Sequence, residues 1–366
     1  MNKKLAFPIF CLLLIAVSLF VINGCGSNAT GGGSSGGGGI SGRQYYGMTS
    51  QGGTVKCTVN DTAFQLDFVA GGSMNVTTLT GTVTQLASGF VSCEITGSSP
   101  SDPNAKGTLY AYEVTNEVIV IGGGPDNGKV IMIAPAFSST APYPLAGSYE
   151  SINIPRTDWI DPGNQQACMT GEITGTTSYK FEVMFFTVAG ALKGSGSVEA
   201  LQYTGDRLYK NDDTPQFFFS PKGLIAGING KQGGVTWEEG GEVGVRYDST
   251  VTVAQVAARN YIGMIFGRSL TNNETQIEMI TVESIGVDSL KVSSMEVSSG
   301  AAIGSPKGTI TLGAMGSPGQ GIINATITGG IPAKMVAYKY QNTPDKYAVC
   351  VFASTESAMS FILIEK

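Results

Sequence analysis

Two short stretches of the sequence place carboxylates beside a tryptophan. Asp158 precedes Trp159 in one stretch, and Glu238 follows Trp237 in the other. Indole rings stack on sugar faces and a pair of acids can cleave a glycosidic bond, so these residues are candidates for a carbohydrate site. However, Glu238 and the adjacent Glu239 would point to opposite faces of a strand. We therefore predict ligand binding, rather than catalysis, by Trp159, Trp237, Asp158 and Glu238.

A further group of acids lies in a turn region of the sequence. Asp206, Asp212 and Asp213 place several oxygen atoms close together along the chain, and Ca²⁺ takes six to eight oxygen ligands. Their spacing does not follow the twelve-residue EF-hand loop, and a solvated surface turn accounts for the same residues. Ca²⁺ is the one metal that the sequence suggests, as a weak alternative, and no other cofactor is indicated.

The composition excludes the common catalytic centres. The chain contains no histidine, so a Ser-His-Asp triad, a histidine base and a histidine-ligated zinc site cannot be built. Gly32-Gly33-Ser34-Ser35-Gly36 matches the Gly-x-Ser-x-Gly pattern of esterases, but it lies in a Gly/Ser-rich run rather than between a strand and a helix. The sequence does not predict an enzyme.

The first residues have the pattern of an export signal. Lys3 and Lys4 precede Leu5–Ile22, an uncharged apolar run of 18 residues. A basic start followed by an apolar core is typical of a secretory signal peptide. The run also reaches the lower limit for a membrane-spanning helix, so an uncleaved N-terminal anchor is the alternative.

Residues Ile22-Asn23-Gly24-Cys25 resemble the lipobox of bacterial lipoproteins. The resemblance implies that residues 1–24 are removed as a signal peptide and that Cys25 becomes an acylated N-terminus. Acyl chains such as palmitate would anchor the chain, because each buried CH₂ contributes about 0.8 kcal/mol. By the same resemblance, Gly26 rather than Asp after the cysteine implies sorting to the outer membrane of the cell envelope, if the cell has one, on its periplasmic or its external face.

Residues 25–42 are predicted to form a flexible Gly/Ser-rich tether. Nine of the seventeen residues from Gly26 to Gly42 are glycine and none is charged, a composition that behaves as a random coil. Without Lys3 and Lys4, 20 of the 22 basic side chains remain against 28 acidic ones, a net charge of −8. This balance argues against a nucleic-acid partner.

The elements that follow the tether are predicted to be strands. Glycine supplies 51 of 366 residues and charged residues only 14%, against a usual quarter, which disfavours long helices. Phe181, Val183 and Phe185 alternate with other residues at the period of a half-buried strand. Val118–Ile121 is apolar throughout and is expected in a sheet covered on both faces. We predict an all-β fold, in which Val251–Tyr261 is expected to form a short helix or a linker.

A short recurring pattern predicts three tandem modules. Tyr45-Tyr46-Gly47-Met48 and Tyr261-Ile262-Gly263-Met264 share the pattern Tyr-x-Gly-Met, and Gly147-Ser148-Tyr149 is the expected opening of a middle copy. Each module is expected to be a small antiparallel sandwich or a meander barrel, and the third is expected to fold alone. The predicted modules are residues 43–145, 146–250 and 251–366.

Four cysteines follow the predicted lipid anchor, and an oxidising compartment would permit disulfides between them. Cys57 and Cys93 lie on apparent strands of the first module. We predict a bond between them, which would close a loop of about 36 residues and contribute about 3–4 kcal/mol. Pairing of Cys168 with Cys350 would join the second module to the third. The alternative for all four is a buried free thiol.

These features predict a lipid-anchored cell-envelope protein with a structural or ligand- or partner-binding β-rich ectodomain. Its expected partners are the membrane, through the N-terminal lipid, and an envelope protein or a glycan. The alternative is a carbohydrate-active or lipid-handling envelope protein that uses the Trp-flanked carboxylates or a barrel cavity. Hydrolysis of a glycan panel that is lost on Glu238→Gln or Asp158→Asn would favour this alternative.

Overall fold

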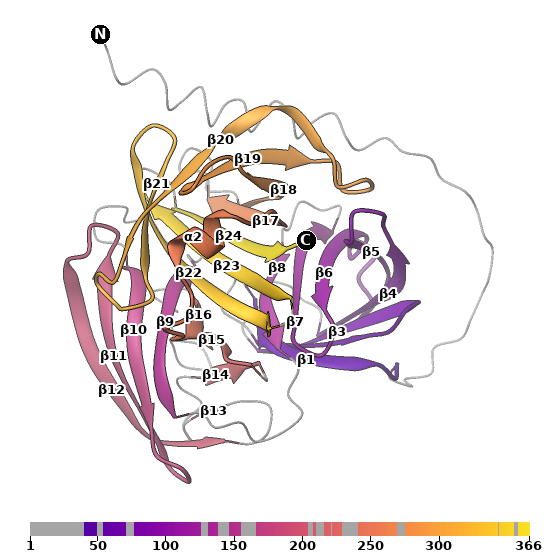
Figure 1. Cartoon of the computed structure of the whole chain (residues 1–366). Coiled ribbons are helices and arrows are strands. Elements are labelled where there is room, and N and C mark those ends of the chain that lie inside the picture. Colours follow the sequence, from indigo (N-terminus) through magenta and orange to yellow (C-terminus); the bar gives the residue numbers. More distant parts are fainter. Residues whose placement is uncertain are drawn as a thin grey trace. The chain divides into compact units, whose positions relative to one another are not determined.

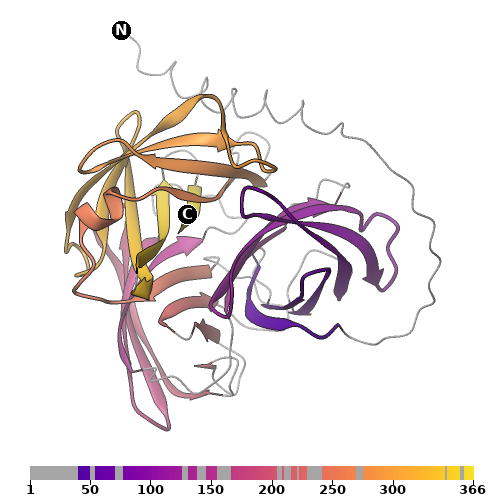
Figure 2. The same cartoon turned by 45° about the vertical axis from the view of Figure 1, so that its right-hand side comes forward.

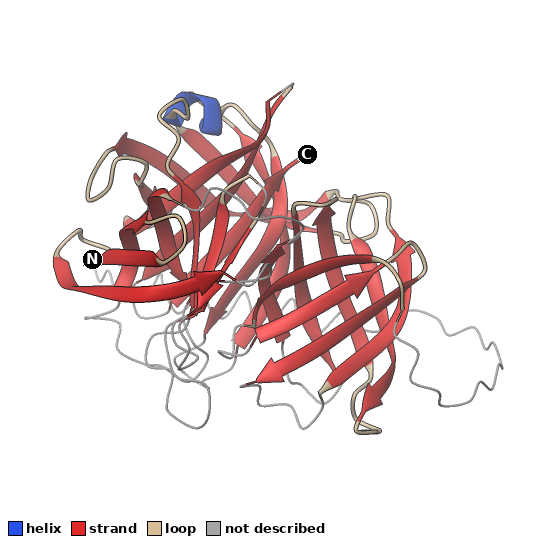
Figure 3. Cartoon of the chain, turned by 90° about the horizontal axis from the view of Figure 1, so that it is seen from below, coloured by secondary structure: helices blue, strands red, loops and turns tan. Residues whose placement is uncertain are grey.

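The computed structural model describes residues 40–49, 54–70, 77–125, 131–137, 146–154, 166–203, 208–209, 216–220, 222–228, 241–268, 275–342, 344–354 and 358–366. Within them the chain is almost entirely β-structure, with one short helix (Figures 1 and 3). The strands form three antiparallel sheets, each of which closes into a barrel of eight strands. The predicted all-β fold with three tandem antiparallel modules is confirmed, and the modules are meander barrels rather than sandwiches.

The first barrel falls within the predicted module 43–145. Figure 2 shows its strands, in indigo and purple, curving into a closed ring. The ring closes where β8 pairs with β1, with Phe137 opposite Tyr46. Its strands are β1 (Arg43–Met48), β2 (Thr54–Val59), β3 (Ala63–Ala70), β4 (Thr78–Gln85), β5 (Val91–Ser99), β6 (Gly107–Val114), β7 (Val118–Pro125) and β8 (Ile131–Phe137).

The second barrel falls within residues 146–250 and closes where its last strand pairs with its first, from Gly241 opposite Ile154 to Arg246 opposite Tyr149. Its longest strand (Leu192–Tyr203) comes directly after the strand that contains Phe181, Val183 and Phe185. Its strands are β9 (Gly147–Ile154), β10 (Gln166–Thr174), β11 (Tyr179–Thr187), β12 (Leu192–Tyr203), β13 (Leu208–Tyr209), β14 (Gln216–Phe219), β15 (Leu224–Ile228) and β16 (Gly241–Arg246).

The third barrel follows the short helix α2 (Val253–Ala257), which lies within the range expected to be a short helix or a linker. Thr252 caps this helix, because its side chain accepts a hydrogen bond from the Gln255 amide while the Gln255 side chain reaches back. The strands are β17 (Tyr261–Arg268), β18 (Thr275–Ser284), β19 (Ser289–Met295), β20 (Ala302–Met315), β21 (Ile323–Ile327), β22 (Ile331–Asn342), β23 (Asp345–Ser354) and β24 (Ala358–Glu365).

Side chains fill the interior of the first barrel. Tyr45, Phe64, Leu66 and Leu109 are at most 2% exposed there, and aliphatic and thiol side chains from the other strands surround them. Each large apolar side chain buried in this way contributes about 1.5–3 kcal/mol relative to an exposed one. The described part of this barrel therefore has a packed core rather than a ligand cavity.

The repeated tyrosine has the same role in each barrel. Tyr45, Tyr149 and Tyr261 lie in the first strand of their barrels and are at most 2% exposed. Successive residues of a strand face opposite sides, so the methionine three positions later faces outward. Met48 and Met264 accordingly join an apolar cluster that lies outside the barrels.

This outer cluster, called the central cluster below, combines outward-facing residues of all three barrels. On β7, Val118 and Val120 belong to the central cluster, whereas Ile119 and Ile121 belong to the core of the first barrel. The apolar run is therefore covered on both faces, as its sequence predicts.

Polar contacts add to the central cluster at the turn between β6 and β7. Glu117 is 2% exposed and accepts a hydrogen bond from the Tyr338 hydroxyl of β22 at 3.3 Å. Ser220, from the turn after β14, also hydrogen-bonds to Glu117, and Lys222 Nζ donates to the Tyr340 carbonyl at 2.5 Å. These contacts connect elements of all three barrels.

In the first and third barrels, the arginine two residues before the repeated tyrosine forms an ion pair with a glutamate. Arg43 donates hydrogen bonds of 2.5 and 2.9 Å to Glu113, and the Tyr45 hydroxyl donates to the same carboxylate. In the third barrel, Arg259 lies 3.4 Å from Glu365. The sequence repeat therefore extends to Arg-x-Tyr-x-Gly-Met, and its charged residue pairs with an acid from another strand of the same barrel.

The second barrel obtains its arginine from its last strand. Gly147 stands two residues before Tyr149, where the other barrels have arginine. Arg246 lies so close that a Cβ on Gly147 would be 2.8 Å from its Nε. The Arg246 guanidinium donates to the Ala146 carbonyl at 2.6 Å. A guanidinium is thus kept beside the tyrosine although the local sequence pattern is lost.

The structure corrects the predicted disulfides, because Cys57, Cys93 and Cys168 are free and buried. The bond between Cys57 and Cys93 was expected from neighbouring strands, but β3 and β4 separate β2 from β5. Burial raises the pKa of the Cys93 thiol to about 12, so it stays protonated at neutral pH. Cys168 lies in the central cluster as a free thiol, so its alternative bond with Cys350 is not formed either.

Candidate functional site

The outward face of β9–β12 carries two rows of mostly polar side chains. Tyr149, Ile173 and Phe181 of these strands face the core of the second barrel, so the residues adjacent to them in the sequence face outward. The strand register places Glu150, Thr170, Met184 and Ser195 in one row, and Ser148, Glu172, Glu182 and Ser197 in the next.

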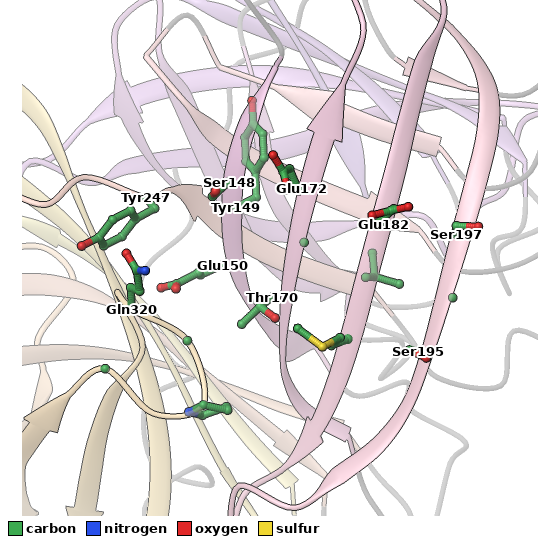
Figure 4. A pocket seen from close by; sticks show the side chains of 17 residues that line it. Ser148, Tyr149, Glu150, Thr170, Glu172, Glu182, Ser195, Ser197, Tyr247 and Gln320 are labelled. Carbon is green, nitrogen blue, oxygen red and sulfur yellow. The ribbon is translucent and has the colours of Figure 1, made fainter.

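These two rows line a cavity of about 710 Å³, called the second-barrel groove below. Its opposite wall consists of residues from the segment 316–320, between β20 and β21, and of Tyr247, just after β16. Figure 4 shows the Glu150 side chain extending from its strand towards Gln320 and Tyr247. The groove thus takes its floor from the second barrel and much of its opposite wall from the third.

Glu150 is the buried acid of the groove. It is 4% exposed, whereas Glu172 and Glu182 are exposed. Burial raises the pKa of the Glu150 carboxyl, and the backbone N–H groups of Gln320 and Gly321 oppose this rise in part. Its Oε2 atom nevertheless receives no hydrogen bond of normal geometry from the described residues.

Thr170 stands directly opposite Glu150 on the neighbouring strand. Its hydroxyl is also buried without a hydrogen-bond partner among the residues that the structure describes. The loop of the third barrel comes very close here, because a Cβ on Gly319 would lie 2.6 Å from Glu150 Oε1 and 2.5 Å from Thr170 Cγ2. Glycine at this position is therefore required for the observed approach of the loop.

Glu172 and Glu182 lie directly opposite each other at the exposed part of the groove. Like charges in this arrangement destabilise a strand pair. Lys180 compensates from outside the groove, with its Nζ 2.6 Å from Glu182 and 3.2 Å from Glu199. The lining of the groove itself contains neither lysine nor arginine, so its charge is negative.

Most residues singled out from the sequence alone lie outside the described residues, and the predictions made for them remain predictions. These residues are Cys25, Asp158, Trp159, Trp237, Glu238, Asp206, Asp212 and Asp213. Conversely, the groove was not predicted from the sequence. Its available signal was the polar alternation of Ser148 with Glu150 and of Thr170 with Glu172, which only the strand register brings together.

The described ranges contain no group of three or more cysteine, aspartate or glutamate side chains that is arranged to hold a metal ion. In the same ranges, no helix is both long enough and apolar enough to cross a membrane.

Comparisons with known proteins place this chain in no family. No protein-family model matches it, and no curated protein matches it. One similar solved structure is a mutant of the vaccine antigen transferrin binding protein B from Haemophilus parasuis Hp5. The two chains are 8% identical with a TM-score of 0.23, over 86% of this chain and 66% of that chain. A TM-score of this size does not establish a common fold.

Proposed function

We propose that this chain is a lipid-anchored cell-envelope protein whose three-barrel ectodomain binds a ligand in the second-barrel groove. The observation that carries this proposal is a cavity of about 710 Å³ lined by two rows of mostly polar side chains, in which Glu150 Oε2 and the Thr170 hydroxyl are buried without a hydrogen bond from the described residues. Its volume lies within the range of about 300–1,000 Å³ that is usual for ligand sites. The anchoring part of the proposal rests on the lipobox-like residues that end at Cys25.

A binding role fits the groove better than catalysis. Hydroxyl and carboxylate side chains from four adjacent strands project into it from a rigid sheet, which is a suitable surface for a polar ligand. The chain has no histidine to act as a proton carrier near neutral pH. A glycan or a segment of an envelope protein would find hydrogen-bond acceptors along both rows.

Lipid handling inside the first barrel is not favoured, because apolar side chains fill the described part of its interior. A role for the Trp-flanked carboxylates stays a hypothesis, which the Glu238→Gln and Asp158→Asn variants test by loss of glycan hydrolysis.

A blocked groove tests the binding proposal. Ser195 is exposed at the rim, so Ser195→Trp should fill the groove without disturbing the core. In full-length protein held in a nonionic detergent, we expect this variant to bind at least tenfold more weakly to ligands found on a glycan and peptide array. Ser305→Trp, at an exposed position on β20, is the matched control. Unchanged binding in Ser195→Trp for every array ligand would exclude the groove as the binding surface.

Mass spectrometry of the mature protein tests the anchor. We expect an acylated Cys25 at the N-terminus and, in Cys25→Ala, unprocessed precursor that retains residues 1–24. Any other mature N-terminus would contradict the lipoprotein part of the proposal.

A further inference from the structure

The longest strand of the second barrel has an open edge. β12 pairs with β11 along most of its length on one side. On its other side, Gln202 and Tyr203 pair with the two-residue strand β13, and none of the described strands pairs with residues 194–201. The backbone N–H and C=O groups of this stretch that point away from β11 are therefore available to a further strand.

The middle of this edge does not carry the features that usually prevent strand addition. Proteins protect exposed edges with proline, charged side chains or bulges. The two register shifts of β12 lie near the ends of the edge, beside Lys193 and Glu199, and residues 194–198 between them include neither proline nor a charged residue. Ser195 and Ser197 are exposed, and Figure 4 shows them on the outermost strand of the groove floor. A partner strand can therefore approach this stretch.

The sequence of the open edge is complementary to itself. Two antiparallel copies of β12 centred on Gly196 place Ser195 opposite Ser197 and Lys193 opposite Glu199. A two-fold axis relates the two copies, so each of these pairs occurs twice. Opposite charges that face each other across two strands stabilise the strand pair. The edge therefore fits a second copy of this chain.

The charges beside the edge favour the same register. Glu182 and Glu199 share one lysine, because Lys180 Nζ lies 2.6 Å from the first carboxylate and 3.2 Å from the second. These three side chains together carry a net negative charge, which Lys193 of a second copy compensates in this arrangement. Leu192 is 61% exposed at the same end of the strand, and the second copy covers part of it.

We infer that this chain forms a two-fold dimer in which the open edges of two β12 strands pair antiparallel about Gly196. Backbone hydrogen bonds supply most of the affinity. The pairs of Lys193 with Glu199 set the register, because exposed ion pairs contribute specificity more than affinity. The inference is separate from the proposed ligand binding, because neither Lys193 nor Glu199 lines the second-barrel groove.

Charge reversal tests the dimer by sedimentation velocity of the full-length protein in a density-matched nonionic detergent, with micelles in excess over protein. We expect the unmodified protein to dimerise as its concentration rises, and Lys193→Glu and Glu199→Lys to dimerise about tenfold more weakly, because like charges then face each other. An equimolar mixture of the two variants should recover the dimer, because both pairs again join opposite charges. Lys106→Glu and Glu94→Lys, at exposed positions of the first barrel, are the matched controls.

Cross-linking tests the register without changing any charge. Under mild oxidation, Ser195→Cys mixed with Ser197→Cys should give a disulfide-linked dimer in about fivefold higher yield than either variant alone, because directly opposite residues are closer than diagonal ones. Ser305→Cys, at an exposed position on β20, is the control. A monomer at every concentration, single charge variants that dimerise as the unmodified protein does, or a mixture that does not recover the dimer would overturn the inference. Array ligands that still bind in the groove would then leave the proposed function standing.

Discussion

At the scale of single residues, the buried carboxylates are the most informative groups. Glu117 lies where elements of three barrels meet, and the Tyr338 hydroxyl donates to its Oε1 atom at 3.3 Å. Its Oε2 atom has no hydrogen bond within the described ranges. Burial raises the pKa of this carboxyl, although Ser220 and the nearby Lys222 oppose the rise. The junction therefore contains a negative charge that folding makes less favourable.

The pH dependence of stability should reveal this charge. A folded-state pKa raised above 4.5 means that the folded protein binds the Glu117 proton more tightly. The contribution of this group to stability is therefore fully present below about pH 4.5 and is lost as pH rises through the folded pKa. Each pKa unit of such a shift corresponds to about 1.4 kcal/mol.

We expect Glu117→Gln to gain stability relative to the unmodified protein as pH rises from 4 to 8, while it keeps an acceptor for Tyr338. Chemical denaturation at a series of pH values measures the difference. Glu94→Gln, at an exposed position on β5, controls for the loss of one negative charge. A difference for Glu117→Gln that does not depend on pH would contradict this interpretation.

At the scale of strands, barrel closure depends on a glycine of the repeated pattern. Gly263 of β17 lies against β24, where an added Cβ would be 2.9 Å from Leu363 Cα and would also overlap the Ile362 carbonyl. The backbone atoms there cannot move aside as a side chain could. An alanine at this position must therefore push the first and last strands of the third barrel apart.

We expect Gly263→Ala to lower the free energy of unfolding by about 1–3 kcal/mol, as overpacking does elsewhere. Gly194→Ala on β12 is the matched control, because no atom lies within 4 Å of its added Cβ. Thermal melting of both variants in the full-length protein makes the comparison. Equal melting temperatures would show that the closing strands tolerate the extra methyl group.

The strands were more predictable than the site they form. The Tyr-x-Gly-Met repeat and the alternation of Phe181, Val183 and Phe185 are local in sequence, and each reflects the period of two that a barrel wall imposes. The groove is not local, because Glu150 and Thr170 become neighbours only through register. The cysteines were predicted wrongly for a related reason: position on a strand does not indicate which strands are adjacent.

At the scale of the whole molecule, the outer surfaces of the three barrels pack together through apolar side chains of the central cluster. Met264, Val336 and Ile362 of the third barrel lie in the central cluster with residues of the other two. A closed barrel still contains its own core and its own strand pairs. Independent folding and reduced solubility are both expected of one barrel separated from the rest.

A fragment of residues 251–366 tests this expectation and retains Thr252 as the cap of α2. We expect a β-type circular dichroism spectrum and a cooperative thermal transition, together with self-association in gel filtration through the exposed part of the central cluster. A Met264→Lys variant of the fragment should reduce self-association. A random-coil spectrum would instead indicate that the barrels fold only together.

The two-sided construction of the second-barrel groove has a mechanical consequence. Glu150 belongs to one barrel and the loop around Gly319 to the next, so a ligand bound as proposed would contact both barrels and hold them together. By thermodynamic linkage, whatever separates the two barrels weakens ligand binding, and occupancy resists their separation to the same extent. A chain anchored to a membrane at one end and holding its target in this groove would therefore release it under a pull that parts the barrels.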